Sequence, residues 1–128
     1  VYLAREKGFD AAMLEDLVDH QSGLLGISGI ASDMRLLREA ASSNADARLA
    51  IAMFCYSVRK QLAAMIAALG GVDRIVFTGG IGEHDALARA EICDGLFSVD
   101  VRVSVLPSQE DDQIARHART LIVQRQTT

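Results

Sequence analysis

Apolar residues recur at helical spacing through the first half of the chain, and later segments alternate between helical and strand-like patterns. Residues 1–8 have the pattern of a helix end closed by Gly8, and Asp10 is placed to cap a second helix that ends near His20. The following residues, 22–30, carry a glycine at every third position. That density favours irregular backbone, with a short strand as the alternative.

Two more helices are predicted before the chain reaches its first strand. Ser32 is the expected cap of the first, which runs to about Ala41. The second is the longest periodic stretch, from Asp46 to Leu69, and it stops at Gly70. Its many alanines favour the close approach of another element, either within the chain or across a dimer interface.

The first strand-like segment, residues 73–78, is a continuous apolar run typical of a central strand covered on both faces. It passes directly into a glycine-rich turn and then into a helix from about Asp85 to Leu96. Residues 99–105 alternate with period two, as expected for a half-exposed or edge strand. Ser108 is placed to cap a final helix. These recurring strand–turn–helix units indicate an α/β fold with a small sheet.

The composition fits one folded domain and excludes several classes of protein. Of the 128 residues, 50% are hydrophobic and 23% charged, which excludes intrinsic disorder. Thirteen Lys and Arg against 17 Asp and Glu give a net charge of −4, the opposite of a nucleic-acid-binding balance. No apolar run approaches membrane-spanning length. The chain begins with Val1 rather than methionine, so a processed or truncated chain is expected.

The metal-binding and redox-active residue types are scattered along the sequence. Cys55 and Cys93 are far apart, and so are the three histidines, so no zinc-type cluster is predicted. Both cysteines are expected to be buried thiols in a reducing cytosol rather than a disulfide or a reactive thiol.

The strongest candidate site is the glycine-rich segment after the first strand, Phe77-Thr78-Gly79-Gly80-Ile81-Gly82-Glu83. A strand that runs into glycines and a helix start presents backbone N–H groups to an anion, and it lets a phosphate or a base approach the main chain. It is not a P-loop, because no Lys-Ser/Thr follows, and Asp85 stands where a dinucleotide fingerprint has its third glycine. A nucleotide site and a turn needed for tight strand–helix packing both remain open.

Two other loops that lead into helices carry candidate polar groups. Asp33 and Arg35 can hold a polar ligand, or can act as a helix cap and a surface ion pair. Glu110-Asp111-Asp112 can hold a hard cation such as Mg²⁺, or can simply favour a helix N-terminus. Two of the three candidate sites follow a predicted strand, where open α/β sheets bind ligands.

Together these segments resemble the acetate kinase family. The resemblance rests on Ser22-Gly23-Leu24-Leu25-Gly26-Ile27-Ser28-Gly29 with Ser32-Asp33-Met34-Arg35, on Phe77-Thr78-Gly79-Gly80-Ile81-Gly82-Glu83, and on Pro107-Ser108-x-Glu110-Asp111 with Ile114-Ala115-Arg116. It runs from Val1 almost to the C-terminus and covers only the C-terminal part of a full-length enzyme. It implies a ribonuclease-H-like, actin-like ATPase fold. Residues 1–128 would form its C-terminal nucleotide-binding domain, incomplete, with a small mixed sheet and flanking helices.

The resemblance also implies a function. Members of the family transfer the γ-phosphoryl group of ATP to acetate or propionate, giving an acyl phosphate and ADP. They use Mg²⁺, are cytoplasmic and form homodimers; neither a nucleic acid nor a membrane is expected as a partner. In this chain the resemblance implies that Asp33, Met34 and Arg35 contact the adenosine. It places Gly80, Ile81, Gly82, Glu83 and His84 along the nucleotide, and it makes Glu110 the magnesium-linked glutamate.

The chain also departs from the family. His84 stands where the family usually has Asn, and the segment between Leu96 and Val101 is shorter. The residues that bind the acyl substrate and stabilise the transferring phosphoryl group lie upstream of Val1 in the family. No catalytic residue is therefore expected here, and the chain alone is expected to be inactive. The alternatives are a stand-alone α/β binding or oligomerisation module, or part of a related butyrate kinase.

Overall fold

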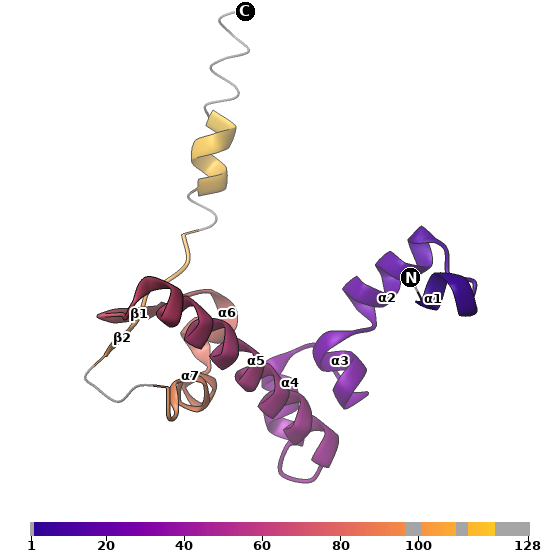
Figure 1. Cartoon of the computed structure of the whole chain (residues 1–128), viewed down its shortest axis with the longest axis horizontal. Coiled ribbons are helices and arrows are strands. Elements are labelled where there is room, and N and C mark those ends of the chain that lie inside the picture. The colour runs from indigo at the N-terminus through magenta and orange to yellow at the C-terminus, as the bar shows by residue number, and fades with distance from the viewer. Residues whose placement is uncertain (1, 97–100, 110–112, 120–128) are drawn as a thin grey trace, which may run out of the picture.

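The computed structural model describes residues 2–96, 101–109 and 113–119 (Figure 1). Two strands follow a series of helices and are separated by two more, and residues 113–119 are also helical. The elements are α1 (Tyr2–Glu6), α2 (Ala11–His20), α3 (Gly23–Ser28), α4 (Met34–Ala40), α5 (Ala45–Leu69), β1 (Arg74–Phe77), α6 (Gly79–His84), α7 (Ala86–Cys93) and β2 (Arg102–Val105).

The long helix α5 is the centre of the fold, and it contacts α3, α4 and α7. Asn44 caps its start by accepting a hydrogen bond from the Ala47 N–H at 2.8 Å, and Gly70 ends it in the left-handed conformation with φ of 75°. The alanines of α5 let these helices approach closely, as predicted. The buried apolar core comprises Met34, Leu37, Ala47, Ala50, Ile51, Cys55, Ile75, Phe77, Ala88 and Ile92.

A second face of α5 is apolar and exposed, with Leu49, Met53 and Tyr56 at helical spacing along it. By its length of 25 residues and its apolar composition alone, α5 could cross a membrane, so the expectation that no apolar run approaches that length is wrong. The central helix of a folded core satisfies the same criterion, and α5 packs against three other helices.

β1 and β2 pair in parallel, in a register that runs from Arg74 opposite Arg102 to Phe77 opposite Val105. Ile75 and Phe77 are buried, whereas the alternate residues of β1 are exposed. β1 is therefore covered on one face only, and the predicted cover on both faces is wrong for the described residues. β2 is exposed along most of its length, as predicted for an edge strand.

The segment 22–30 is the largest departure from the sequence-based prediction. Residues 23–28 form the helix α3, which packs against α5, rather than irregular backbone or a strand. Gly29 ends α3 in the left-handed conformation with φ of 64°, and a Cβ at Gly26 would lie 2.8 Å from the Gln21 carbonyl oxygen. The glycines therefore serve a helix end and a close backbone approach.

Other boundaries shift by a few residues. Asp33, not Ser32, caps α4. The glycine-rich segment expected to be a turn is itself the short helix α6, which begins at Gly79 directly after the strand. α7 begins after Asp85 as predicted but ends at Cys93, before Leu96.

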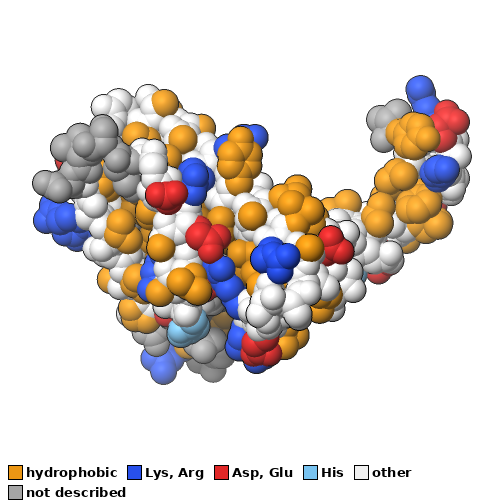
Figure 2. All heavy atoms as spheres, turned by 90° about the horizontal axis from the view of Figure 1, so that it is seen from below, with side chains coloured by type: hydrophobic (Ala, Val, Ile, Leu, Met, Phe, Trp, Pro, Cys, Tyr) orange, Lys and Arg blue, Asp and Glu red, His pale blue; other side chains and the backbone are white. Residues whose placement is uncertain are grey.

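The helices α1 and α2 form an arm that stands out from the body of the molecule (Figures 1 and 2). Neither helix has a buried residue. Asp10 caps α2 as predicted, accepting a hydrogen bond from the Met13 N–H at 2.8 Å. The Phe9 N–H donates to the Leu3 carbonyl at 3.2 Å, so local hydrogen bonds close the turn between the two helices.

Candidate functional site

A pocket of about 560 Å³ lies between the start of α4 and the α6–α7 segment. Two loops that were predicted as separate candidate sites, at Asp33 and at Gly80, both line this pocket. Its lining residues are Ser32, Asp33, Met34, Arg35, Arg38, Gly80, Ile81, His84, Asp85 and Leu87. Six of the eight residues that the resemblance relates to the nucleotide therefore lie around one pocket, whereas Gly82 and Glu83 do not line it.

In the α4 wall of the pocket, Asp33 acts as a helix cap and Arg35 forms a surface ion pair, the two structural roles considered for them from the sequence. Asp33 Oδ1 accepts hydrogen bonds from the backbone N–H groups of Arg35 at 2.7 Å and Leu36 at 3.1 Å, so Asp33 is the helix cap. The Arg35 guanidinium pairs with Glu39 at 3.1 Å on the exposed surface. Such a surface pair is weak, so the Arg35 side chain can exchange Glu39 for a ligand at little cost.

The two glycines of the opposite wall serve different purposes. A Cβ added at Gly82 would lie 3.5 Å from the Phe77 side chain, at ordinary contact distance, so this glycine faces the packing of α6 on β1. Gly80 borders the pocket, and no atom lies within 4 Å of the position that its Cβ would take. The packing interpretation therefore fits Gly82, and Gly80 leaves room for a ligand beside the main chain.

Glu83 has a role that the sequence pattern did not reveal. Its Oε1 atom accepts hydrogen bonds from the Gly79 N–H at 2.8 Å and from the Ser108 N–H at 2.7 Å. The Gly79 N–H is therefore occupied by the protein's own carboxylate. Glu83 ties the start of α6 to the segment that follows β2, and it acts on the pocket only through the backbone it holds.

A cluster of three charged residues joins α4 to the α6–α7 segment, and two of its members, Arg38 and Asp85, also line the pocket. The Arg38 Nε–H donates to Asp85 Oδ2 at 3.0 Å, and its Nη1 donates to Glu91 Oε1 at 2.7 Å. The side chains of Arg38 and Asp85 are only 22% and 15% exposed, so solvent screens this pair less than a surface pair. Among the described residues, Arg38 Nη2 is buried and has no hydrogen-bond partner.

Asp85 is held in its charged form by its surroundings. Burial by itself raises the pKa of this carboxyl, but hydrogen bonds from the Ala88 N–H and from Arg38, with the attraction of Arg38, bring the pKa below its usual value. Its Oδ1 caps α7 by accepting from Ala88 at 2.8 Å, which leaves Oδ2 for Arg38. No short sequence pattern marks this cluster, because Arg38 is 47 residues from Asp85.

Both cysteines are free thiols, as predicted. Cys55 is buried, but Cys93 is only half-buried, so the prediction of two buried thiols is wrong for Cys93. Burial, reinforced by Glu91, raises the pKa of Cys55 to about 11. We expect iodoacetamide at pH 8 to label Cys55 at least about 100-fold more slowly in the folded chain than in urea. Mass spectrometry of the labelled peptides measures both rates. Cys93 is the internal comparison, and equal folded-state rates at the two sites would contradict the buried position of Cys55.

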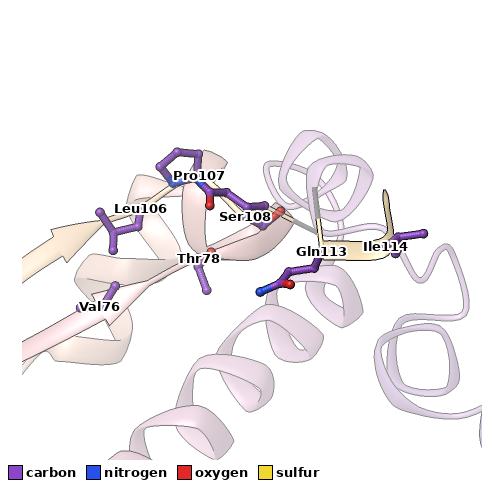
Figure 3. Close-up of a pocket in the computed structure, with 8 residues that line it drawn as sticks. Val76, Thr78, Leu106, Pro107, Ser108, Gln113 and Ile114 are labelled. Atoms are coloured by element: carbon purple, nitrogen blue, oxygen red, sulfur yellow. The ribbon is translucent and has the colours of Figure 1, made fainter. Parts of the chain in front are cut away.

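A second hollow, of about 770 Å³, lies at the carboxyl ends of β1 and β2. Figure 3 shows residues from the ends of both strands on one side; across from them the Gln113 side chain extends toward Thr78, whereas that of Ile114 points away. The predicted magnesium residue Glu110 follows this segment in sequence but lies outside the described residues, as do Asp111 and Asp112. In the part of the chain that the structure describes, no group of three or more His, Cys, Asp or Glu residues could hold a metal ion.

Comparison with known proteins points to one family. The model of the acetokinase family matches residues 1–127. The acetate kinase of Brachyspira hyodysenteriae is 46% identical over 101 residues, which is 79% of this chain and 26% of that enzyme. The chain thus spans about a quarter of the length of this relative.

Solved structures give the same picture. Acetate kinase from Porphyromonas gingivalis superposes with a TM-score of 0.80 and 32% identity, over 94% of this chain and 37% of that one. A propionate kinase from Francisella tularensis superposes with a TM-score of 0.76 and 29% identity, over 85% and 34%. The chain therefore has the α/β fold of a part of these acetate and propionate kinases, as the resemblance implied.

Proposed function

Because the chain belongs to the acetokinase family, we propose that it is the nucleotide- and magnesium-binding C-terminal part of an acetate or propionate kinase. The complete enzyme would transfer the γ-phosphoryl group of ATP to a short-chain carboxylate, giving an acyl phosphate and ADP. The observation that carries the proposal is the pocket between α4 and α6–α7, where six residues related to the nucleotide by resemblance come together.

The chemistry of this pocket suits a nucleoside. Its volume of about 560 Å³ lies in the range typical of small-molecule sites. Apolar groups from Met34, Ile81 and Leu87 offer contact for a planar base, while Arg35 and His84 offer polar contact for a sugar or phosphate. Phosphoryl transfer depends mostly on positioning and charge neutralisation, so a domain that holds the nucleotide can be separate from the groups that act on the acceptor.

The bare sheet supports the interpretation of the chain as one part of a longer enzyme. Val76 is exposed on one face of the sheet, and Val103 and Val105, which pair with Ile75 and Phe77, are exposed on the other. The described residues therefore leave apolar side chains uncovered on both faces of the sheet. A two-stranded sheet is marginal by itself, and the chain spans about a quarter to just over a third of its relatives. We propose that the remaining part covers these exposed valines and supplies the catalytic groups, in a cytoplasmic homodimer.

Magnesium enters the proposal only through Glu110. The described residues offer no group of three or more His, Cys, Asp or Glu side chains that could hold the ion. When bound, Mg²⁺ would neutralise phosphate charge on the nucleotide. Glu110, positioned in the sequence just after the strand-end hollow, is the residue proposed to be linked to it.

The proposal is tested with the 128-residue chain itself. Calorimetric titration with ADP and Mg²⁺ is expected to show weak binding, because the pocket is present but the rest of the cleft is not. Binding is expected to weaken further when EDTA removes the metal. Incubation with ATP, Mg²⁺ and acetate or propionate is expected to yield no acyl phosphate. Pyrophosphate is the control ligand, because it has phosphates but no base and is expected to bind less well than ADP.

Robust acyl-phosphate formation would contradict the assignment of catalysis to another part of the enzyme. If the titration with ADP and Mg²⁺ shows no heat of binding, the result would instead favour the alternative function, an oligomerisation module. The exposed apolar face of α5 formed by Leu49, Met53 and Tyr56 favours that alternative. Sedimentation of a dimer that binds no nucleotide would support it.

A further inference from the structure

We propose that Arg38 is a positioning residue for the nucleotide pocket, acting through Asp85 and Glu91 to hold the α4 wall against the α6–α7 wall. The inference rests on the proposed nucleotide-binding function of this pocket. It concerns the cluster of Arg38, Asp85 and Glu91, which lies between the pocket walls and to which neither the sequence pattern nor the resemblance assigned a role.

The cluster connects the pocket walls directly. Arg38 lies one helical turn after Met34, on the helix whose first residues form one wall. Asp85 directly follows His84, the last residue of α6, and caps α7. The Arg38–Asp85 hydrogen bond therefore joins the first wall to the junction between the two helices of the second wall.

Helices of both walls also pack against α5. Both α4 and α7 pack against α5, and within the described residues the hydrogen bonds that join α4 to the α6–α7 segment are the two donated by Arg38. Without them, the separation of the walls would depend on the packing of each helix against α5. A charged pair with both partners largely buried is sensitive to the loss of one partner, since the other charge is left without compensation.

The far side of α7 is fastened independently. Arg59 of α5 donates hydrogen bonds to the backbone carbonyls of Glu91 and Ile92 at the end of α7. Arg59 does not line the pocket. Removing its guanidinium therefore weakens the attachment of α7 while leaving the link between the pocket walls intact, which makes Arg59 the matched control.

The test compares Arg38→Gln and Asp85→Asn with Arg59→Gln in the 128-residue chain. Asparagine is as good a helix cap as aspartate, so Asp85→Asn keeps the cap of α7 and removes the charge that Arg38 contacts. Two quantities are measured: the dissociation constant for ADP with Mg²⁺, and the hydrogen-exchange rates of the backbone amides of residues 80–84 relative to those of α5. Thermal unfolding of every variant records general destabilisation.

If Arg38 positions the walls, Arg38→Gln and Asp85→Asn raise both the ADP dissociation constant and the exchange rates of residues 80–84 by about tenfold. Arg38→Lys, which keeps the charge but contacts one carboxylate at a time, gives an intermediate value. Arg59→Gln lowers the unfolding temperature but leaves both the ADP dissociation constant and these exchange rates near those of the unaltered chain.

Unchanged exchange rates in Arg38→Gln and Asp85→Asn would overturn the positioning role, and so would an equal weakening of ADP binding by Arg59→Gln at the same loss of stability. If the unaltered chain binds no ADP, the proposed function fails. The exchange rates of residues 80–84 still decide whether Arg38 holds the walls together, because that measurement needs no nucleotide.

Discussion

Replacing Leu37 with alanine is expected to lower the free energy of unfolding by about 3–5 kcal/mol. Leu37 is 0% exposed and is the largest fully buried side chain among the described residues. It lies on α4, which packs against the central helix α5. Several other core members are alanines, so few large side chains remain to fill the space that Leu37 would leave. A loss of this size is a large share of the roughly 5–15 kcal/mol that stabilises a typical domain.

The neighbouring residue is a matched control for this prediction. Leu36 is on the same helix but 41% exposed, so Leu36→Ala makes the same chemical change with the same helix propensity and is expected to cost less than about 1 kcal/mol. Urea unfolding followed by circular dichroism at 222 nm measures both variants. Equal losses of stability for the two would contradict the assignment of Leu37 to the core between α4 and α5.

Placing a leucine at Gly80 is expected to weaken ADP binding more than about tenfold without destabilising the fold. No atom lies within 4 Å of the position of an added Cβ, and Gly80 does not have a positive φ, so the backbone accepts a side chain there. Glycine within a helix is less favourable than alanine by about 0.5–1 kcal/mol, so stability is expected to stay equal or rise. The added side chain would extend into the space proposed for the nucleotide.

Two further variants separate blocking of the pocket from damage to the fold. Gly80→Ala adds only one methyl group and is expected to have a smaller effect on ADP affinity than Gly80→Leu. Gly82→Ala adds the same group on the packing side of α6, at ordinary contact distance from Phe77, and is expected to leave the affinity unchanged. Calorimetry with ADP and Mg²⁺ together with thermal unfolding measures the series. Undiminished ADP binding by Gly80→Leu would exclude this pocket as the nucleotide site.

The elements that could be predicted are those whose signals are local. The caps at Asp10 and Gly70 and the periodicity of α5 act within a few residues, and the structure places these elements close to where they were expected. α3 was missed because its glycines are locally unfavourable to a helix, whereas its packing against α5 involves residues distant in the sequence. The apolar run of β1 predicted burial on both faces, but within the described residues only Ile75 and Phe77 are buried, because nothing described packs on the face of Val76.

The candidate site divides in the same way. The loops at Asp33 and Gly80 carry local signals, and the fold brings them to one pocket. The residues that interact over long sequence distances carry no local signal. Arg38 is 47 residues from Asp85 and 53 from Glu91, and Glu83 is 25 residues from Ser108. A single sequence does not show which arginine will meet which carboxylate, because such pairs are set by the packing of α4 and α7 against α5 rather than by spacing.

The two hydrogen bonds accepted by Glu83 bear on how readily residues can be inserted or deleted between β1 and the segment after β2. They fix Gly79 and Ser108, the residues that follow the two parallel strands, at one carboxylate oxygen. The segment between Gly79 and Ser108 starts and ends at two fixed points. The pairing of β1 with β2 and the Glu83 carboxylate set the distance between these points, whatever the length of the segment. When the ends of a connecting segment are fixed, a change in its length alters the entropy cost of closing it only slowly. The segment between Leu96 and Val101, expected to be shorter than in the acetate kinase family, lies between these two fixed points. A deletion there can be accommodated without moving the end of either strand.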